Sequence, residues 1–269
     1  MPERPVPTAL SIAGSDSGGG AGIQADLKAF ARCGVHGTTA ITAITAQNTV
    51  GVEAVAPIAP EIIVAQVRAI AEDIGVDAVK VGMLGTAATV EAVVEALAYV
   101  GDAPVVIDPV MVAESGATLL DDAARAALVE RLLPLIAVAT PNIPEARALT
   151  GLSEAALQDE LAGGVLDLGP KAVVVTGGHS EDLVDFFFDG TALIQIPGEK
   201  HPGGAAHGSG CTHSSALAAF LARGLSPLEA SRKARKVASE AVGNGLREIG
   251  AGPGPVDVFG LAERDPGTD

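Results

Sequence analysis

The chain has 269 residues, of which 48% are hydrophobic and 19% are charged, so it has ample material for a folded core. This composition excludes intrinsic disorder, and the length suggests one large or two small domains. The 17 basic residues against 33 acidic ones give a net charge of −16. That charge argues against a nucleic-acid or anionic-membrane surface, because both need a basic face to replace counterions.

The two cysteines, Cys33 and Cys211, are too few for a disulfide scaffold at this length and fit a reducing compartment. The N-terminal segment lacks the charged-then-apolar pattern of a signal peptide. No apolar run approaches the roughly 18–20 residues of a membrane span. We therefore expect a cytoplasmic protein.

Short β-branched runs alternate along the chain with amphipathic stretches of helical period. The runs predict strands at 8–13, 39–46, 78–81, 105–107, 136–140 and 172–176. The stretches predict helices at 21–31, 60–74, 87–100, 121–133 and 153–161. Such alternation predicts an α/β fold with a mostly parallel central sheet, flanked by helices on both faces.

The pattern changes after residue 180. Runs at 183–188 and 192–196, separated by Asp189-Gly190-Thr191, predict a C-terminal antiparallel hairpin. A Gly- and Pro-rich loop at 197–210 precedes two predicted helices, at 211–222 and 227–244. Since no linker divides the chain, we expect a single domain over 1–269, with flexible ends at 1–7 and 260–269.

Three unusual loops fall where ligands bind in open parallel sheets, outside the carboxyl ends of the strands. They are AGSDSGGGAGIQAD at 13–26, PNIPE at 141–145 and HGSGCTHSSALAA at 207–219. Glycines between a strand and a helix let the backbone approach a ligand, and free N–H groups at a helix start attract anions. These loops predict a site for an anionic small molecule.

The first loop satisfies the Gly-x-Gly-x-x-Ala form of the dinucleotide fingerprint, from Gly20 to Ala25. That fingerprint also needs an acidic residue about 20 positions further on, to hold the ribose. Residues 34–52 contain no Asp or Glu, so the match is weak. A Walker A loop is excluded because the dipeptide Gly-Lys does not occur in the chain.

The third loop is the most informative. Gly208, Ser209, Gly210 and Cys211 are expected to present uncommitted backbone amides at the positive end of a helix. Such amides suit the spread negative charge of a transferring phosphoryl group. Cys211 falls in the first turn of that helix, where a thiol pKa can fall well below its free value of about 8.5.

Several motifs occur in the order of one family. They are AGSDSGGGAGIQADLK, TAITAQNTVGV, KVGML, VIDPVM, TPNIPEA, GGH and HGSGCT, spread from about residue 8 to residue 256. The chain thereby resembles the hydroxymethylpyrimidine/phosphomethylpyrimidine kinases of the ribokinase superfamily. The resemblance implies a ribokinase-like fold, usually a homodimer, that uses ATP and Mg²⁺. It also implies phosphorylation of 4-amino-5-hydroxymethyl-2-methylpyrimidine, and then of its monophosphate, in thiamine biosynthesis.

The resemblance also implies a set of substrate-binding residues. Asp26 would accept a hydrogen bond from the pyrimidine amino group, and Gln47 would offer a donor and an acceptor to the ring. Ala21, Met83 and Val110 match positions that pack on the flat ring.

On the nucleotide side, Asn142 and Glu145 match the Asn-x-x-Glu motif that organises Mg²⁺ near the phosphates, with Asp108 supporting the same ion. Thr176 and Gly178 would lie beside the nucleotide. Thr176 stands where close relatives often carry Lys, so it can hydrogen-bond a phosphate but cannot neutralise one. Cys211 stands where most ribokinase relatives carry an Asp base, and would accept the substrate proton or position the hydroxyl.

Two other functions remain open at this point. Pyridoxal kinase activity uses the same loops on a similar nitrogen heterocycle with a hydroxymethyl arm. The other alternative is a non-catalytic pyrimidine-binding regulator, against which the complete phosphoryl-transfer motifs argue.

Overall fold

The computed structural model describes residues 5–112, 116, 119–178 and 183–263. Its strands form one nine-stranded sheet in the order β3-β2-β1-β4-β5-β6-β7-β8-β9. Pairing is parallel from β2 through β7, whereas β3, β8 and β9 are antiparallel to their neighbours. The strands are β1 (Thr8–Asp16), β2 (His36–Gln47), β3 (Val52–Pro57), β4 (Ala78–Val81), β5 (Val105–Ile107), β6 (Val138–Ala139), β7 (Ala172–Val175), β8 (Val184–Phe188) and β9 (Leu193–Pro197).

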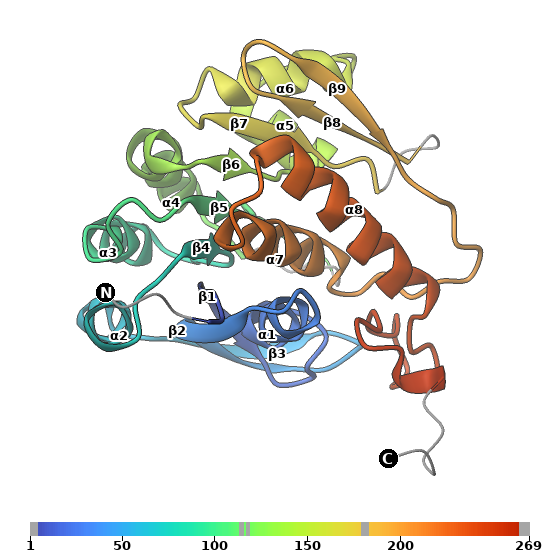
Figure 1. The fold of residues 1–269 in the computed structure, drawn as a ribbon, viewed down its shortest axis with the longest axis horizontal. Helices are drawn as coiled ribbons and strands as arrows, with labels where there is room; N and C mark the ends of the chain where they lie inside the picture. The colour runs from blue at the N-terminus through green and yellow to red at the C-terminus, as the bar shows by residue number, and fades with distance from the viewer. Residues whose placement is uncertain (1–4, 113–115, 117–118, 179–182, 264–269) are drawn as a thin grey trace.

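Helices cover both faces of this sheet, as Figure 1 shows. One face carries α1 (Gly22–Arg32), α7 (Ser209–Ala222) and α8 (Pro227–Gly243). The other carries α2 (Pro60–Asp73), α3 (Ala87–Leu97), α4 (Asp122–Ala127), α5 (Ile143–Thr150) and α6 (Gln158–Leu166). The predicted α/β class, with its mostly parallel sheet and C-terminal hairpin, is confirmed.

Apolar side chains of each strand point alternately to the two faces of the sheet, so each face has its own apolar core. In β4, Val79 and Val81 join the core beneath α2 and α3, while Ala78 joins the core beneath α1 and α7. The same alternation recurs in β5 and β7, because successive side chains of a strand point to opposite faces. Both faces are therefore buried, as a parallel sheet requires.

The structure corrects the prediction in three places. The predicted helix at 153–161 is wrong in extent, since α5 lies before it and α6 begins at Gln158. The helix predicted over 121–133 is α4 followed by a π turn and a 3₁₀ turn that ends at Leu135. Strand β3 was not predicted, because none of its residues is buried and an edge strand without a buried face lacks alternation.

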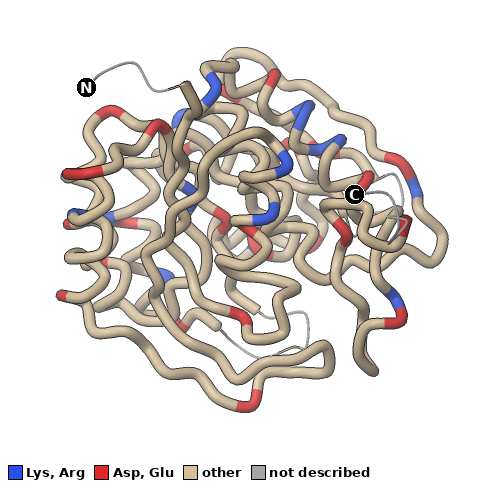
Figure 2. The backbone as a smooth tube through the Cα atoms, turned by 60° about the horizontal axis from the view of Figure 1, so that its bottom comes forward, with Lys and Arg blue, Asp and Glu red and all other residues tan. Residues whose placement is uncertain are grey.

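Charged residues are interspersed along the backbone, as Figure 2 shows, with α8 carrying Arg232, Lys233, Arg235 and Lys236. We expected flexible ends at 1–7 and 260–269. Within the second range, the described residues Leu261–Glu263 form a 3₁₀ turn. No helix among the described residues is long and apolar enough to cross a membrane.

Candidate functional site

The loops that follow the parallel strands meet the start of α7 at the carboxyl edge of the sheet. After β1, the Ser17 hydroxyl donates to the Gln47 carbonyl oxygen at 2.6 Å. A bridge joins Asn142 and Thr176, which follow β6 and β7. A side chain at Gly210 would lie 3.7 Å from Asp108 Oδ2. The structure thus brings the three predicted loops into one neighbourhood.

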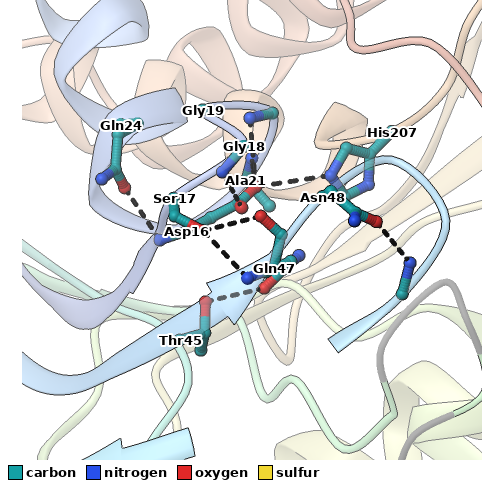
Figure 3. A network of polar contacts seen from close by, with 12 residues as sticks. Asp16, Ser17, Gly18, Gly19, Ala21, Gln24, Thr45, Gln47, Asn48 and His207 are labelled. Atoms are coloured by element: carbon teal, nitrogen blue, oxygen red, sulfur yellow. Dashed lines mark hydrogen bonds and ion pairs between the residues drawn. The ribbon is translucent and has the colours of Figure 1, made fainter. Parts of the chain in front are cut away.

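Asp16, at the end of β1, shapes the glycine-rich loop that follows it. Its carboxylate accepts hydrogen bonds from the backbone N–H groups of Gly18, Gly20 and Ala21, at 2.8, 3.0 and 2.9 Å. His207 Nε2 lies 3.5 Å from Asp16 Oδ2 (Figure 3). Burial alone would raise the pKa of Asp16, but the His207 interaction and the backbone bonds hold it below its ordinary value.

The start of α7 packs directly on this glycine-rich loop. Gly208 caps α7 in the left-handed conformation, with φ +84°, which favours glycine. A side chain there would lie 1.8 Å from the Gly20 carbonyl oxygen, so the contact also requires glycine. Because His207 directly precedes Gly208, its approach to Asp16 fixes the two loops against each other.

The first turn of α7 offers fewer amides than the motif predicts. The Ser209 N–H donates to the Ala206 carbonyl oxygen at 2.9 Å, so it is already committed. Within the described residues, the N–H groups of Gly210 and Cys211 have no backbone acceptor. An anion at this helix start would therefore meet the amides of Gly210 and Cys211.

The Cys211 thiol does not have the lowered pKa that its place in the helix suggested. It is half-buried, and burial raises its pKa to about 12. The Lys80 ammonium opposes this rise, whereas the negative charges of Asp108 and Asp26 add to it. The positive end of a helix is thus outweighed by desolvation, and the thiol stays protonated at neutral pH.

Asp26 also differs from the prediction. Its carboxylate is fully buried and lies 2.9 Å from Lys80 Nζ, and it accepts hydrogen bonds of 2.6 Å from both Ser11 and Ser215. With both oxygens held inside the protein, Asp26 cannot make the predicted contact with a pyrimidine amino group. It lies beneath the site and joins β1, β4 and α7 through one polar cluster.

Gln47 occupies the predicted position at the end of β2. Its Oε1 lies 3.1 Å from the Thr45 hydroxyl, and its backbone N–H donates to Ser17 Oγ at 2.9 Å (Figure 3). Within the described part of the chain, its amide Nε2 has no hydrogen-bond partner. The side chain is half-buried and keeps a donor for a ligand.

The three apolar residues predicted to face the ring are all half-buried and follow different strands. Ala21 is the N-cap of α1, Met83 follows β4, and Val110 follows β5. Met83 reaches across to β1, where a side chain added at Gly14 would lie 2.7 Å from its Cε. These positions line the same edge as Gln47.

Asn142 and Glu145 form a capping box at the start of α5. The Asn142 side chain accepts from the Glu145 N–H at 2.9 Å, and the Glu145 carboxylate accepts from the Asn142 N–H at 2.9 Å. Both residues of the Asn-x-x-Glu motif therefore have a helix-capping role. Thr176 is tied to the same loop, since its N–H donates to the Pro141 carbonyl oxygen at 2.9 Å.

The charges of Asp108 and Glu145 fit a divalent cation. Burial raises the pKa of Asp108, and burial together with the Asp108 charge raises the pKa of Glu145 to about 8. The buried Asp108 and the half-buried Glu145 repel each other, and both would ionise more readily beside Mg²⁺, which takes oxygen ligands and retains waters. Among the described residues, no group of three acidic, histidine or cysteine side chains is placed to hold a metal ion.

Gly178 lies in open space, with nothing within 4 Å of an added side chain. His179, the last residue of the GGH motif, lies outside the described residues.

Sequence reasoning missed Asp16, His207 and Lys80. A signal for Lys80 was present, because this lysine lies inside the four-residue strand β4. A lysine in a strand covered on both faces has to be buried and needs a carboxylate partner. His207 and Asp16 carried no local signal, because nearly 200 residues separate them in the chain.

Comparisons with known proteins show the family to which the chain belongs. Residues 16–257 match the family model described as phosphomethylpyrimidine kinase. Hydroxymethylpyrimidine/phosphomethylpyrimidine kinase of Rhizobium meliloti is 48% identical over 93% of this chain and 96% of its own, and that of Bacillus subtilis is 45% identical over 93% and 94%. The structure of Staphylococcus aureus pyridoxal kinase in complex with ADP superposes with a TM-score of 0.87 at 34% identity, covering 97% of this chain and 96% of that one. The chain therefore belongs to the phosphomethylpyrimidine kinase family.

Proposed function

We propose that this kinase transfers the γ-phosphoryl group of ATP to the hydroxymethyl oxygen of 4-amino-5-hydroxymethyl-2-methylpyrimidine. A second transfer, to the resulting monophosphate, gives the diphosphate used in thiamine biosynthesis. The observation that carries this proposal is the close approach of Gly208 to Gly20, because an anion at the start of α7 would then lie against the loop beside Gln47. Relatives that share 45–48% identity with the chain carry the same two activities in their name.

The pyrimidine ring is expected to lie between Ala21, Met83 and Val110. The free Gln47 amide nitrogen would donate to a ring nitrogen, while its oxygen has capacity for the amino group. Asp26 has a structural role beneath the site: it ties α1 to α7 through Ser215, to β1 through Ser11 and to β4 through Lys80.

In each transfer an oxygen–phosphorus bond forms at the acceptor, and the bond from the γ-phosphorus to ADP breaks. The amides of Gly210 and Cys211 would stabilise the charge that spreads over the phosphoryl oxygens. In the first transfer the hydroxymethyl group releases its proton to water as the new bond forms. Since burial keeps the Cys211 thiol protonated, this side chain is better suited to orienting the hydroxyl than to removing its proton beforehand.

Asp108 and Glu145 would hold Mg²⁺ through oxygen ligands and waters. When bound, the ion neutralises charge on the phosphates. This is needed in a chain of net charge −16, with Thr176 in the place where relatives often carry a cation.

Pyridoxal kinase activity is the second candidate, because pyridoxal kinase of Staphylococcus aureus superposes at 34% identity. The two functions are separated by measuring ADP release with hydroxymethylpyrimidine, its monophosphate and pyridoxal in parallel, under Mg-ATP. We expect kcat/KM for the pyrimidine to exceed that for pyridoxal by at least about tenfold. A preference for pyridoxal would reverse the assignment.

We further propose a homodimer that forms through β2 and β3. Val55 of the edge strand β3 is 49% exposed, Ile44 of β2 is 51% exposed, and Val50 between these two strands is 64% exposed. Apolar side chains on an unpaired edge are normally covered by another chain.

We also propose a cytoplasmic location, because two free cysteines fit a reducing compartment.

A further inference from the structure

A buried charged cluster lies between α7, α8 and the hairpin β8–β9, apart from the residues assigned above. Asp185 in β8 is fully buried, and its Oδ1 lies 3.4 Å from Arg235 Nη1 of α8. His213 of α7 is 4% exposed, and its Nε2 lies 3.7 Å from Asp185 Oδ2. Isolated charges are costly to bury, so this pairing calls for a role.

The cluster holds both described ends of the segment that joins β7 to β8. At the β7 end, the Gly177 N–H donates to Asp185 Oδ1 at 2.9 Å. At the β8 end, the Arg235 guanidinium donates to the Leu183 carbonyl oxygen. Leu183 has φ +50°, the left-handed conformation that a branched side chain rarely adopts. Local strain of this kind persists only where the surroundings impose it.

Other contacts support the placement of Arg235 and of the two strand ends near Asp185. Gly198 makes room for Arg235, because a side chain there would lie 1.8 Å from its Nη2. The Gln158 amide nitrogen donates to the carbonyl oxygens of Val175 and Val184, at 2.8 and 2.9 Å. The end of β7 and the start of β8 are therefore fixed from α6 as well as from α8.

Gly177 lies between Thr176 and Gly178, the two residues that the family resemblance predicts to lie beside the nucleotide. His213 follows Cys211 by two positions in α7, so the helix that carries the Gly210 and Cys211 amides also packs on Asp185. The buried Asp185 carboxylate thus accepts the Gly177 N–H beside the predicted nucleotide position. It also approaches His213 of α7, the helix whose start is proposed to bind the phosphate.

We propose that Asp185 is a positioning residue for ATP, which sets the Thr176–Gly178 backbone against the start of α7. Arg235 supplies the counter-charge of that carboxylate and orients it, and it holds the Leu183 end of the same segment. This inference rests on the proposed nucleotide role of Thr176 and Gly178. It assigns a function to a side chain that does not touch the substrates.

Two substitutions separate positioning from stability. Asp185→Ala removes the acceptor of the Gly177 N–H, and we expect the ATP KM and the Kd of a fluorescent ADP analogue to rise at least about tenfold. Asp185→Asn keeps an acceptor but leaves Arg235 without its counter-charge. We expect this variant to lose thermal stability while its ATP KM stays within about threefold of wild type.

Asp77→Ala is the matched control. Asp77 also accepts a backbone N–H, that of Thr8 at 2.8 Å, but at the opposite, amino edge of the sheet. It should lower the melting temperature with an unchanged ATP KM. The KM for hydroxymethylpyrimidine should stay within about twofold of wild type in all three variants.

The proposal is overturned if Asp185→Ala leaves the ATP KM unchanged, or if Asp185→Asn raises it as much as Asp185→Ala does. Thr176→Val, measured alongside, separates the positioning role of Asp185 from the placement of Thr176 beside the nucleotide. If Thr176→Val raises the ATP KM and Asp185→Ala does not, the positioning role is wrong and the nucleotide placement stands. If neither substitution changes the ATP KM, both are wrong. If Asp185→Ala does not fold, Arg235→Lys replaces it, because one ammonium group cannot hold both Asp185 and Leu183. An unchanged ATP KM in that variant also overturns the proposal.

Discussion

At the residue scale, Cys211 places a neutral thiol beside the two free amides of α7. Cys211→Ala should lower kcat about 10- to 100-fold, because the substrate hydroxyl loses an orienting contact. The pyrimidine KM should change little, since the ring contacts lie on other loops. Cys211→Ser, with a hydroxyl of similar size, should recover part of the rate. Steady-state kinetics decide the matter, and an Ala variant within about threefold of wild type would mean that the amides and Mg²⁺ supply the catalysis.

Gln47→Ala should raise the pyrimidine KM, because a hydrogen bond in a desolvated pocket contributes about 1–3 kcal/mol, or roughly 5- to 150-fold. The ATP KM should remain unchanged. Gln66→Ala is the matched control, since among the described residues the Gln66 side chain bonds to the backbone of Ile41 alone, at 3.0 and 3.1 Å. If both variants changed the pyrimidine KM equally, Gln47 would be structural.

Single residues also show where reading the sequence fails. The neighbourhood of Gln47, Asn142 and Gly208 was predictable, because motifs that end successive parallel strands share one edge. The burial of Asp26 was not, because helical spacing does not reveal that Lys80 of β4 points at it. The raised pKa of Cys211 likewise depends on desolvation by packed neighbours, which a helix-start motif does not report.

At the scale of elements, the capping box of α5 carries a pH dependence. The pKa of Glu145 is raised from 4.5 to about 8, so the folded protein keeps a proton that the unfolded chain releases. Stability therefore falls as pH rises between these values, and Glu145→Gln should remove that fall. In denaturant titrations without Mg²⁺, the variant should gain on wild type by more than about 1 kcal/mol between about pH 5 and pH 8.

The matched control for Glu145→Gln is Glu160→Gln, which removes the exposed acid that caps α6 in the same way. Mg²⁺ added at high pH should stabilise wild type more than Glu145→Gln. A wild-type stability that rises across this pH range would contradict the raised pKa of Glu145.

Element prediction failed where local signals were ambiguous. Pro144 in the PNIPE segment suggested a loop, although proline suits the first turn of a helix and here stands in α5. Strands buried on both faces, such as β4 and β5, were predicted with their bounds, because their apolar runs are continuous.

At the scale of the whole molecule, one continuous sheet from β3 to β9 supports our proposal that the chain is a single domain. The proposed dimer is tested by sedimentation velocity. Wild type should sediment as a dimer, and Val55→Asp should dissociate it by placing two carboxylates at an apolar contact. Ile62→Asp, which alters a side chain of similar exposure on α2, should leave the dimer intact. A monomeric wild type at micromolar concentration would contradict the proposal.

The central claim is successive phosphoryl transfer to one pyrimidine, and ³¹P NMR of a single reaction tests it most directly. With Mg-ATP and hydroxymethylpyrimidine, we predict a monophosphate ester resonance that rises first and then declines as a diphosphate pair grows, matched by ADP. No pyrimidine phosphate signal, from enzyme that phosphorylates pyridoxal under the same conditions, would contradict the account.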